Sequence, residues 1–275
     1  MATSDERARA AGAAVLREER DERGVVTLTM DRPGSRNAFD GRLIAALEEA
    51  AGRLGSDPGV RAIVLTGAGG TFSAGADVVW MREVSALPHD EDVAEQARMS
   101  AMYRALYDLP RPLIGRVEGY AFGGGCGLAA VCDVVVATDD ARFALSEARL
   151  GLAPAIISPF VVRKIGASAS RELFIRAASF DAARALAIGL VHRVVSAAEL
   201  HAAVDEVVDD CLHAGPEAVA TLKALVEAGS APLDEAQAPL AETIVGLRRS
   251  PEGQEGTAAF REKRRPAWWP PAPPV

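Results

Sequence analysis

The chain has 275 residues, and 49% of them are hydrophobic, so it can bury a full core as one large domain or two small ones. Its formal net charge of −8 argues against a nucleic-acid partner. The three cysteines include no CxxC pair, which disfavours a disulfide framework or a zinc site. Residues 1–12 lack the apolar segment of a secretory signal, and no apolar run is long enough to span a membrane. We therefore expect a cytoplasmic protein without a membrane partner.

Short apolar runs alternate with helical patterns over the first part of the chain. Asp40 has the character of a helix N-cap, and Leu43, Ile44 and Leu47 follow it on one helix face. A mixed polar segment over 78–97 is interpreted as mobile, with a helix beginning at about Val93. Such alternation favours parallel strands with crossover helices. The expected strands are 14–19, 25–30, 60–66, 113–117 and 134–137, and the expected helices include 93–107 and 124–131.

Helical patterns dominate from Ser158 onward, where Ser158 and Pro159 fit the N-cap and first helical position. The tail after this helical part is rich in proline and is predicted to be irregular. The chain therefore divides into an extension over 1–12, an α/β core over 13–195, a helical region over 196–266 and a tail over 267–275. The helices expected after the core are 196–213, 216–228, 232–247 and 251–263.

Two glycine-rich turns, residues 67–77 and 119–127, each follow a short apolar run. Glycine lets two backbones approach closely and adopt positive φ. Two such turns can therefore aim peptide N–H groups at one point, which is what a developing oxyanion requires. Glu147 lies further along the chain. The set predicts acid–base chemistry on a polarised carbonyl. The simpler interpretation is that the glycines only make tight turns and that Glu147 pairs with Arg149 at the surface.

Three competing motifs fail in this sequence. No Gly-Lys-Ser/Thr follows either glycine cluster, so neither is a Walker loop. Leu128 stands where a dinucleotide fingerprint needs glycine or alanine. Thr71 stands where a nucleophile elbow around Ser73 needs glycine. The two turns therefore fit none of these nucleotide-binding or hydrolase motifs.

In combination and order, several segments between residues 14 and 265 resemble the enoyl-CoA hydratase/isomerase (crotonase) superfamily. They are Arg36-Asn-Ala-Phe39, Phe72-Ser-Ala-Gly-Ala-Asp77, Gly119-Tyr-Ala-Phe-Gly-Gly-Gly-Cys126, Cys132-Asp133, Ser146-Glu147 and Ala187-Ile-Gly-Leu-Val-His-Arg-Val-Val195. The resemblance implies an α/β core built as a spiral of ββα units, with C-terminal helices that assemble a homotrimer or a hexamer of two trimers. It also implies an acyl-CoA substrate, oxyanion donors at the N–H groups of Ala76 and Gly124, and Glu147 as the proton shuttle.

One position departs from the resembled hydratases, which carry a second Glu directly after the GGGC turn. Gly127 stands there in this chain. A single carboxylate suffices for a Δ3-Δ2 enoyl-CoA isomerase, which moves a proton between carbons. The segment from Leu145 through Ser158-Pro159 instead resembles a bacterial branch of methylglutaconyl- or isohexenylglutaconyl-CoA hydratases, whose members often lack the second Glu. Both enzyme hypotheses therefore stay open, beside a catalytically idle binding protein on the same fold.

The resemblance also implies how a CoA thioester is held. The backbone around Arg36, Ala38, Ala74 and Asp77 would hold the CoA arm, while Phe260 and Lys263 would close over the nucleotide from a neighbouring subunit. The substrate-binding set further includes Met81, Tyr120, Phe122 and Gly123. No cofactor is expected, because coenzyme A enters as part of the substrate. No metal is expected either, since the four histidines have no ligand spacing.

Overall fold

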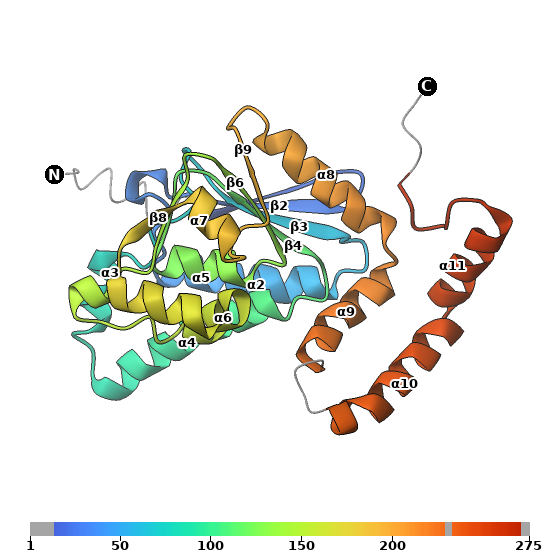
Figure 1. The fold of residues 1–275 in the computed structure, drawn as a ribbon. Helices are drawn as coiled ribbons and strands as arrows, with labels where there is room; N and C mark the ends of the chain where they lie inside the picture. Colours follow the sequence, from blue (N-terminus) through green and yellow to red (C-terminus); the bar gives the residue numbers. More distant parts are fainter. Residues whose placement is uncertain (1–13, 229–232, 271–275) are drawn as a thin grey trace.

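The computed structural model describes residues 14–228 and 233–270, and a twisted sheet lies at the centre of the molecule (Figure 1). Its strand order is β1-β2-β3-β4-β6-β9, with β1 antiparallel to β2 and every other pairing parallel. Helical crossovers between parallel strands confirm the α/β architecture expected from the sequence. The strands are β1 (Leu16–Arg20), β2 (Val25–Met30), β3 (Ala62–Gly67), β4 (Leu113–Val117), β6 (Val134–Thr138) and β9 (Arg193–Val195).

A second, smaller sheet consists of β5 (Tyr120–Phe122), β7 (Arg142–Ala144) and β8 (Ser179–Asp181). The sequence analysis does not anticipate it, because strands of three residues are too short to show an alternating pattern. β5 and β7 are parallel, and Phe122 is in register with Ala144. The segments that follow these two strands therefore begin side by side, at the carboxyl end of the sheet.

Four helices cover one face of the main sheet: α2 (Gly41–Ser56), α4 (His89–Tyr107), α5 (Gly124–Val131) and α6 (Ser158–Arg176) (Figure 1). The predicted start of α2 is confirmed, because the Asp40 carboxylate accepts the N–H groups of Arg42 and Leu43. The predicted apolar stripe of α2 is buried in the core.

The opposite face of the sheet is covered by α8 (Leu200–His213) (Figure 1). Its Leu200, Val204 and Val208 pack against sheet residues such as Val64 and Ile114 in a second apolar cluster. The sequence analysis places the end of the core at residue 195, so it assigns α8 to the C-terminal helical region, although α8 packs directly on the sheet of the core. Three short elements complete this part of the fold: η1 (Pro33–Ser35), η2 (Glu147–Leu150) and α7 (Ala182–Ala187).

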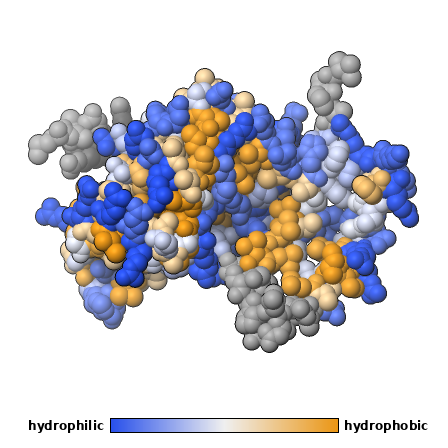
Figure 2. Space-filling view, in the orientation of Figure 1, coloured by the Kyte–Doolittle hydropathy of each residue, from blue (hydrophilic) through white to orange (hydrophobic). Residues whose placement is uncertain are grey.

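The last three helices, α9 (Pro216–Ala228), α10 (Leu233–Arg249) and α11 (Pro251–Glu262), extend away from the α/β core (Figure 1). They agree closely with the helices expected from the sequence. Figure 2 shows apolar surface gathered over this part of the molecule. The exposed apolar side chains on these helices are Leu222, Val226, Ile244, Val245 and Phe260.

Two local expectations are wrong. The segment expected to be mobile forms α3 (Val78–Val84) and the first turns of α4, because Asp77 caps α3 and acidic residues in the first turn of α4 favour a helix N-terminus. In α6 the N-cap is Ile157 rather than Ser158, whose hydroxyl donates instead to the carbonyl of Ala155.

The start of the proline-rich tail is irregular but docked. The indole N–H groups of Trp268 and Trp269 both donate to the carbonyl of His213, at 3.3 and 2.9 Å, and Arg61 donates to the carbonyl of Trp268 at 2.8 Å. The predicted extension over 1–12 and the last residues, 271–275, lie outside the described residues. Among the residues that the structure describes, no helix has the length and apolar character needed to cross a membrane.

Candidate active site

The two glycine-rich turns meet in the structure. The Ser73 N–H donates to the Tyr120 carbonyl at 2.9 Å, and the Phe122 N–H donates to the Ser73 carbonyl at 3.0 Å. At Gly75, φ is +87°, and a Cβ would lie 2.6 Å from the Phe122 oxygen and 3.1 Å from the Gly124 nitrogen. Glycine is therefore required at this position for the two backbones to approach.

The backbone N–H groups of Ala76 and Gly124 both lie at this junction. Phe39 hydrogen-bonds the residues before and after Ala76 but not Ala76 itself. Its N–H donates to the Gly75 carbonyl, and its carbonyl accepts the Asp77 N–H. Gly124 opens α5, where the first N–H groups have no partner within the helix. Within residues 14–228 and 233–270, neither N–H donates a hydrogen bond. Two donors thus stand available beside one cavity.

Glu147 reaches the same place from the second sheet. It lies three residues after the end of β7, whereas Gly123 directly follows β5, and the Gly123 N–H donates to the Ala144 carbonyl at 2.7 Å. A Cβ on Gly123 would lie 3.1 Å from Glu147 Oε1, so the carboxylate lies against the glycine turn. The parallel pairing of β5 and β7 therefore brings Glu147 next to the start of α5.

The Glu147 carboxylate is poorly solvated. Its Oε2 atom is buried and has no hydrogen-bond partner in the described part of the chain. Burial raises the pKa of Glu147 above its ordinary value, partly offset by a hydrogen bond from its own backbone. The described residues show no ion pair between Glu147 and Arg149, so the surface-pair interpretation finds no support. A carboxylate with a raised pKa is a stronger base than an ordinary one, which suits a group that takes up a proton during catalysis.

A cavity of about 400 Å³ joins these groups. Ala76, Gly124 and Glu147 form one part of its wall. Side chains from α3, α4 and the segment before α6 form the rest: Phe39, Trp80, Met81, Ser85, Asp92, Gln96, Met99, Leu152, Ala153, Pro154, Ala155, Ile156 and Ile157. Trp80 is only 9% exposed and Met81 is partly buried against the same core, so both side chains belong to the core as well as to the cavity wall.

Tyr103, which the sequence analysis does not single out, holds the Gly124 peptide. Its hydroxyl donates to the Gly124 carbonyl at 2.8 Å, and its ring is buried between Phe39 and Phe160. That carbonyl belongs to the peptide between Gly124 and Gly125, next to the peptide that carries the Gly124 N–H, so the bond restrains the backbone beside this donor. Rigid donors are the ones that stabilise developing charge. The only sequence signal for Tyr103 is its place on the buried stripe of α4, together with Met99 and Leu106.

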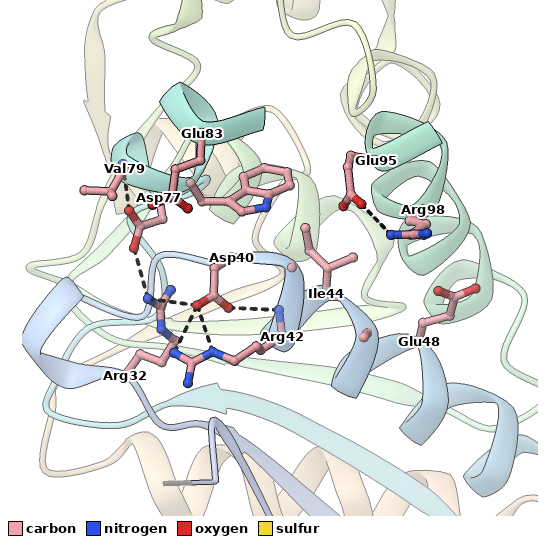
Figure 3. Close-up of a pocket in the computed structure, with 13 residues that line it drawn as sticks. Arg32, Asp40, Arg42, Ile44, Glu48, Asp77, Val79, Glu83, Glu95 and Arg98 are labelled. Carbon is pink, nitrogen blue, oxygen red and sulfur yellow. Dashed lines mark hydrogen bonds and ion pairs between the residues drawn. The ribbon is translucent and has the colours of Figure 1, made fainter. Parts of the chain in front are cut away.

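Arg32 is a second residue that the sequence analysis misses. Its guanidinium pairs with Asp77 at 3.0 Å and Asp40 at 3.2 Å (Figure 3), and it also donates to the Ala38 carbonyl. Asp40 caps α2 and Asp77 caps α3, so one guanidinium ties two helix starts together beside Ala76. These residues line a groove of about 630 Å³ that shares the Trp80 wall with the cavity.

The expected CoA-arm residues only partly gather. The Ala74 N–H donates to the Arg36 carbonyl at 2.9 Å, and the Arg36 guanidinium lies 5.9 Å from the centre of the Tyr120 ring. The Tyr120 ring in turn packs on Phe122 at 5.1 Å. At Ala38 the N–H donates to Ser35 and the carbonyl accepts from Arg32.

Asp77 also has its groups in use within the chain. Its N–H donates to Phe39, and its carboxylate caps α3 and pairs with Arg32. The backbone N–H groups of Asp77 and Ala38 both donate within the chain, so neither is available to bind CoA. The expected binding role is left to van der Waals contacts or to a hydrogen bond that CoA donates to one of their carbonyls.

Phe260 and Lys263 lie on and just after α11, and neither lines the cavity that contains Glu147. Phe260 is 86% exposed, the largest exposure among the exposed large apolar side chains. Arg264, the residue after Lys263, pairs with Glu255 and Glu262. Within the described residues, no group of three or more His, Cys, Asp or Glu side chains is placed to hold a metal ion.

The position after the GGGC turn is closed. A Cβ on Gly127 would lie 2.4 Å from Ile157 Cγ2 and 3.0 Å from Tyr103 Cε1. Gly127 is itself buried within α5. Ile157 and Tyr103 therefore occupy the space that a second carboxylate would need.

These features describe an acid–base site for a carbonyl compound, and comparison with known proteins places the chain in a family. The sequence model of the enoyl-CoA hydratase/isomerase family matches residues 20–270. The chain belongs to that family and is one of its enzymes, as the resemblance in its motifs predicts.

Individual relatives agree with this assignment. The crystal structure of an enoyl-CoA hydratase from Mycobacterium smegmatis is 38% identical with a TM-score of 0.87, and the match covers 93% of this chain and 99% of that one. A protein named carnitinyl-CoA dehydratase in Proteus mirabilis is 33% identical, over 89% of this chain and 94% of its own length. A probable enoyl-CoA hydratase of Mycobacterium tuberculosis is 33% identical, over 90% and 95%. The predicted crotonase-type α/β fold with a helical C-terminal region is thereby confirmed.

Proposed function

We propose that the protein is an enoyl-CoA hydratase-type enzyme that acts on an unsaturated acyl-CoA thioester through an oxyanion hole and a single carboxylate. The observation that carries the proposal is the meeting of three groups at one cavity: the N–H groups of Ala76 and Gly124 and the Oε2 atom of Glu147, none of which has a hydrogen-bond partner among the residues that the structure describes. Acyl-CoA chemistry at the carbon next to the carbonyl needs these two functions, charge stabilisation and proton transfer.

The oxyanion hole stabilises the enolate-like state. When water adds to the double bond, negative charge develops on the thioester oxygen. The N–H groups of Ala76 and Gly124 would donate to that oxygen, and each such donor is worth about 3–4 kcal/mol in comparable sites. Gly124 also begins α5, so the positive end of the helix dipole adds to the stabilisation.

Glu147 would carry the proton in both directions. As a carboxylate it accepts a proton from water while the water oxygen forms its bond to the β-carbon and the double-bond electrons move toward the carbonyl. The resulting carboxylic acid then returns a proton to the α-carbon as the thioester carbonyl re-forms. Burial raises the pKa of Glu147, which makes its carboxylate a stronger base for the first of these two transfers.

A second candidate, the Δ3-Δ2 enoyl-CoA isomerase, is favoured by the contact between Gly127 and Ile157. Isomerisation moves a proton from one carbon to another through the same enolate and needs no second carboxylate to position water. The closed, apolar wall at Gly127 fits that requirement. The names of the relatives favour the hydratase instead.

The remaining parts of the proposal concern CoA and assembly. We propose that Arg36, Ala74 and Tyr120 contact the CoA arm, since they lie together beside the glycine turns. We also propose a homotrimer or a pair of trimers, in which a neighbour supplies Phe260 and Lys263. Its support is the exposed apolar surface of α9–α11, which extends beyond the core. A monomer in sedimentation at micromolar concentration would remove the assembly proposal.

A product assay in deuterated water tests the function. The purified protein is given 2-enoyl-CoA and 3-enoyl-CoA thioesters in parallel, and products are separated by mass. A hydratase forms 3-hydroxyacyl-CoA from the 2-enoyl compound. An isomerase converts the 3-enoyl compound without adding water. Absence of both products, with the Glu147→Gln variant indistinguishable from wild type on every thioester, contradicts the proposal.

A further inference from the structure

One wall of the cavity is a stripe along α4. Asp92, Gln96 and Met99 are spaced so that they share one helix face, and all three line the cavity. Gln96 Nε2 donates to Asp92 Oδ1 at 3.1 Å, which orients the carboxylate. The cavity is therefore apolar at Met99 and polar at Asp92 and Gln96.

The polar end lies far from the reacting atoms. Tyr103, on the same helix, touches the Gly124 peptide at the proposed oxyanion hole. Asp92 precedes it by about three turns, or about 16 Å along the helix axis at 1.5 Å per residue. Asp92 is thus too distant to take part in proton transfer at the thioester, and it faces the space that the far end of an acyl chain would reach.

The charges around the cavity have a single sign. Its ionisable lining residues are Asp92 and Glu147, and no Lys, Arg or His of the described chain lines it. Arg32 and Arg98 lie on the other groove, beyond Trp80, where both are in ion pairs. An acyl chain that carries a distal carboxylate would enter without a cation to pair with it and would meet the carboxylate of Asp92.

We propose that Asp92, held by Gln96, is a specificity residue that excludes acyl chains with a distal carboxylate, so that the substrates are enoyl-CoA thioesters with an uncharged end. This inference rests on the proposed function, since it concerns the acyl chain of that same site. It disagrees with a methylglutaconyl-type substrate, whose acyl group carries a free carboxylate at its far end.

The test uses three CoA thioesters of equal chain length that end in methyl, primary amide or carboxylate. Affinities of the saturated compounds are measured by calorimetry, and kcat/KM is measured with the unsaturated ones. The wild-type protein should bind the carboxylate-ended compound about 10–100-fold more weakly than the amide-ended one, because two like charges approach in a partly dry space. The deficit should appear in Kd and KM rather than in kcat.

Two variants assign the effect to Asp92. Asp92→Asn keeps the shape and removes the charge, so the gap between carboxylate and amide should shrink at least about fivefold. Glu91→Gln, an exposed neighbour on the same helix that does not line the cavity, is the matched control and should leave the gap unchanged. Equal wild-type affinities for the two compounds, or equal effects of the two variants, would overturn the inference. Calorimetric discrimination without turnover of any thioester would support it and count against the proposed function instead.

Discussion

A Cβ on Gly127 would lie 2.4 Å from Cγ2 of Ile157, which is closer than real Cβ atoms approach. Ile157 is the N-cap of α6, and Gly127 lies inside α5, so the contact joins two packed helices. The absence of a second acid is therefore part of how the core packs. A Glu side chain at position 127 would fit only if the residues packed against that position also changed.

The first prediction follows from this contact. Gly127→Ala should destabilise the fold by about 1–3 kcal/mol, because the added methyl group overpacks a buried site. Combining it with Ile157→Ala should recover part of that loss relative to the sum of the single variants. Urea unfolding of the four proteins forms a double-mutant cycle. Additive effects would show that the two residues do not compete for one space.

The same contact bears on activity. Gly127→Glu is expected to raise the rate of enoyl-CoA hydration only when it is combined with Ile157→Ala.

The second prediction concerns Glu147 as the proton shuttle. Glu147→Gln preserves the shape of the side chain but cannot exchange a proton. General acid–base catalysis contributes about 10²–10⁴-fold, so kcat should fall by at least that order. The affinity for a saturated acyl-CoA should change little, because the N–H groups of Ala76 and Gly124 are unaffected. Near-normal turnover by the variant on the best substrate would show that another group carries the proton.

The third prediction uses the raised pKa of Glu147. Below its ordinary pKa of 4.5, the carboxyl is protonated in both the folded and the unfolded chain, and it contributes nothing to the pH dependence of stability. As the pH rises above 4.5, the unfolded chain ionises first, so the folded state loses stability until the folded pKa is passed. The Glu147→Gln variant does not lose stability in this way, because its amide does not ionise. Its free energy of unfolding should exceed that of the wild type by an amount that grows with pH above 4.5 and then levels off.

Glu199→Gln is the matched control for that experiment. The hydroxyl and N–H of Ser196 donate to the Glu199 carboxylate and lower its pKa, so its contribution has the opposite sign. Because Glu199 is exposed, its effect should also be small. Unfolding by urea is measured from pH 4 to about 8 for the three proteins. A difference between Glu147→Gln and wild type that does not depend on pH would show that the carboxyl is not desolvated.

The sequence predicts the parts of the site that depend on local chemistry. Asp40 is recognisable as a cap because its carboxylate bonds N–H groups two and three residues away. The glycine turns are recognisable because strained or crowded backbone, as at Gly75, leaves no other residue type. Glu147 was recognised only in combination with those turns and with the family motifs.

The parts that sequence reasoning missed depend on contacts between distant segments. Arg32 acquires its role only when Asp77 is folded beside it, and Tyr103 only when Gly124 lies within reach of its hydroxyl. In neither case does the sequence around the residue indicate which distant residue it will contact. The closed position at Gly127 was likewise invisible, because Ile157 fills it from another helix.

The fourth prediction concerns Arg32 as a positioning residue. Arg32→Leu removes the cation between the partly buried carboxylates of Asp40 and Asp77, and each lost charged hydrogen bond costs about 1–3 kcal/mol. Stability should therefore fall, and the Ala76 peptide should lose its fixed place. A positioning role requires kcat to fall with little change in the affinity for saturated acyl-CoA, at a temperature where the variant is fully folded. Arg42→Leu, which removes the more exposed cation beside Asp40 and leaves Arg32 between the two carboxylates, is the control and should retain kcat.

The last prediction concerns the docked start of the tail. Deletion of residues 268–275 removes both indole donors to the His213 carbonyl and the carbonyl that Arg61 binds, whereas deletion of residues 271–275 removes none of these bonds. The longer deletion should lower the thermal midpoint and weaken the packing of α11, where Gly256 lies against the Trp268 ring. If α11 presents Phe260 to a neighbouring subunit, the longer deletion should also dissociate the assembly in sedimentation and raise KM, while the shorter one behaves as wild type. Equal midpoints and equal KM for the two deletions would show that the tryptophans neither anchor α11 nor support the proposed nucleotide contact.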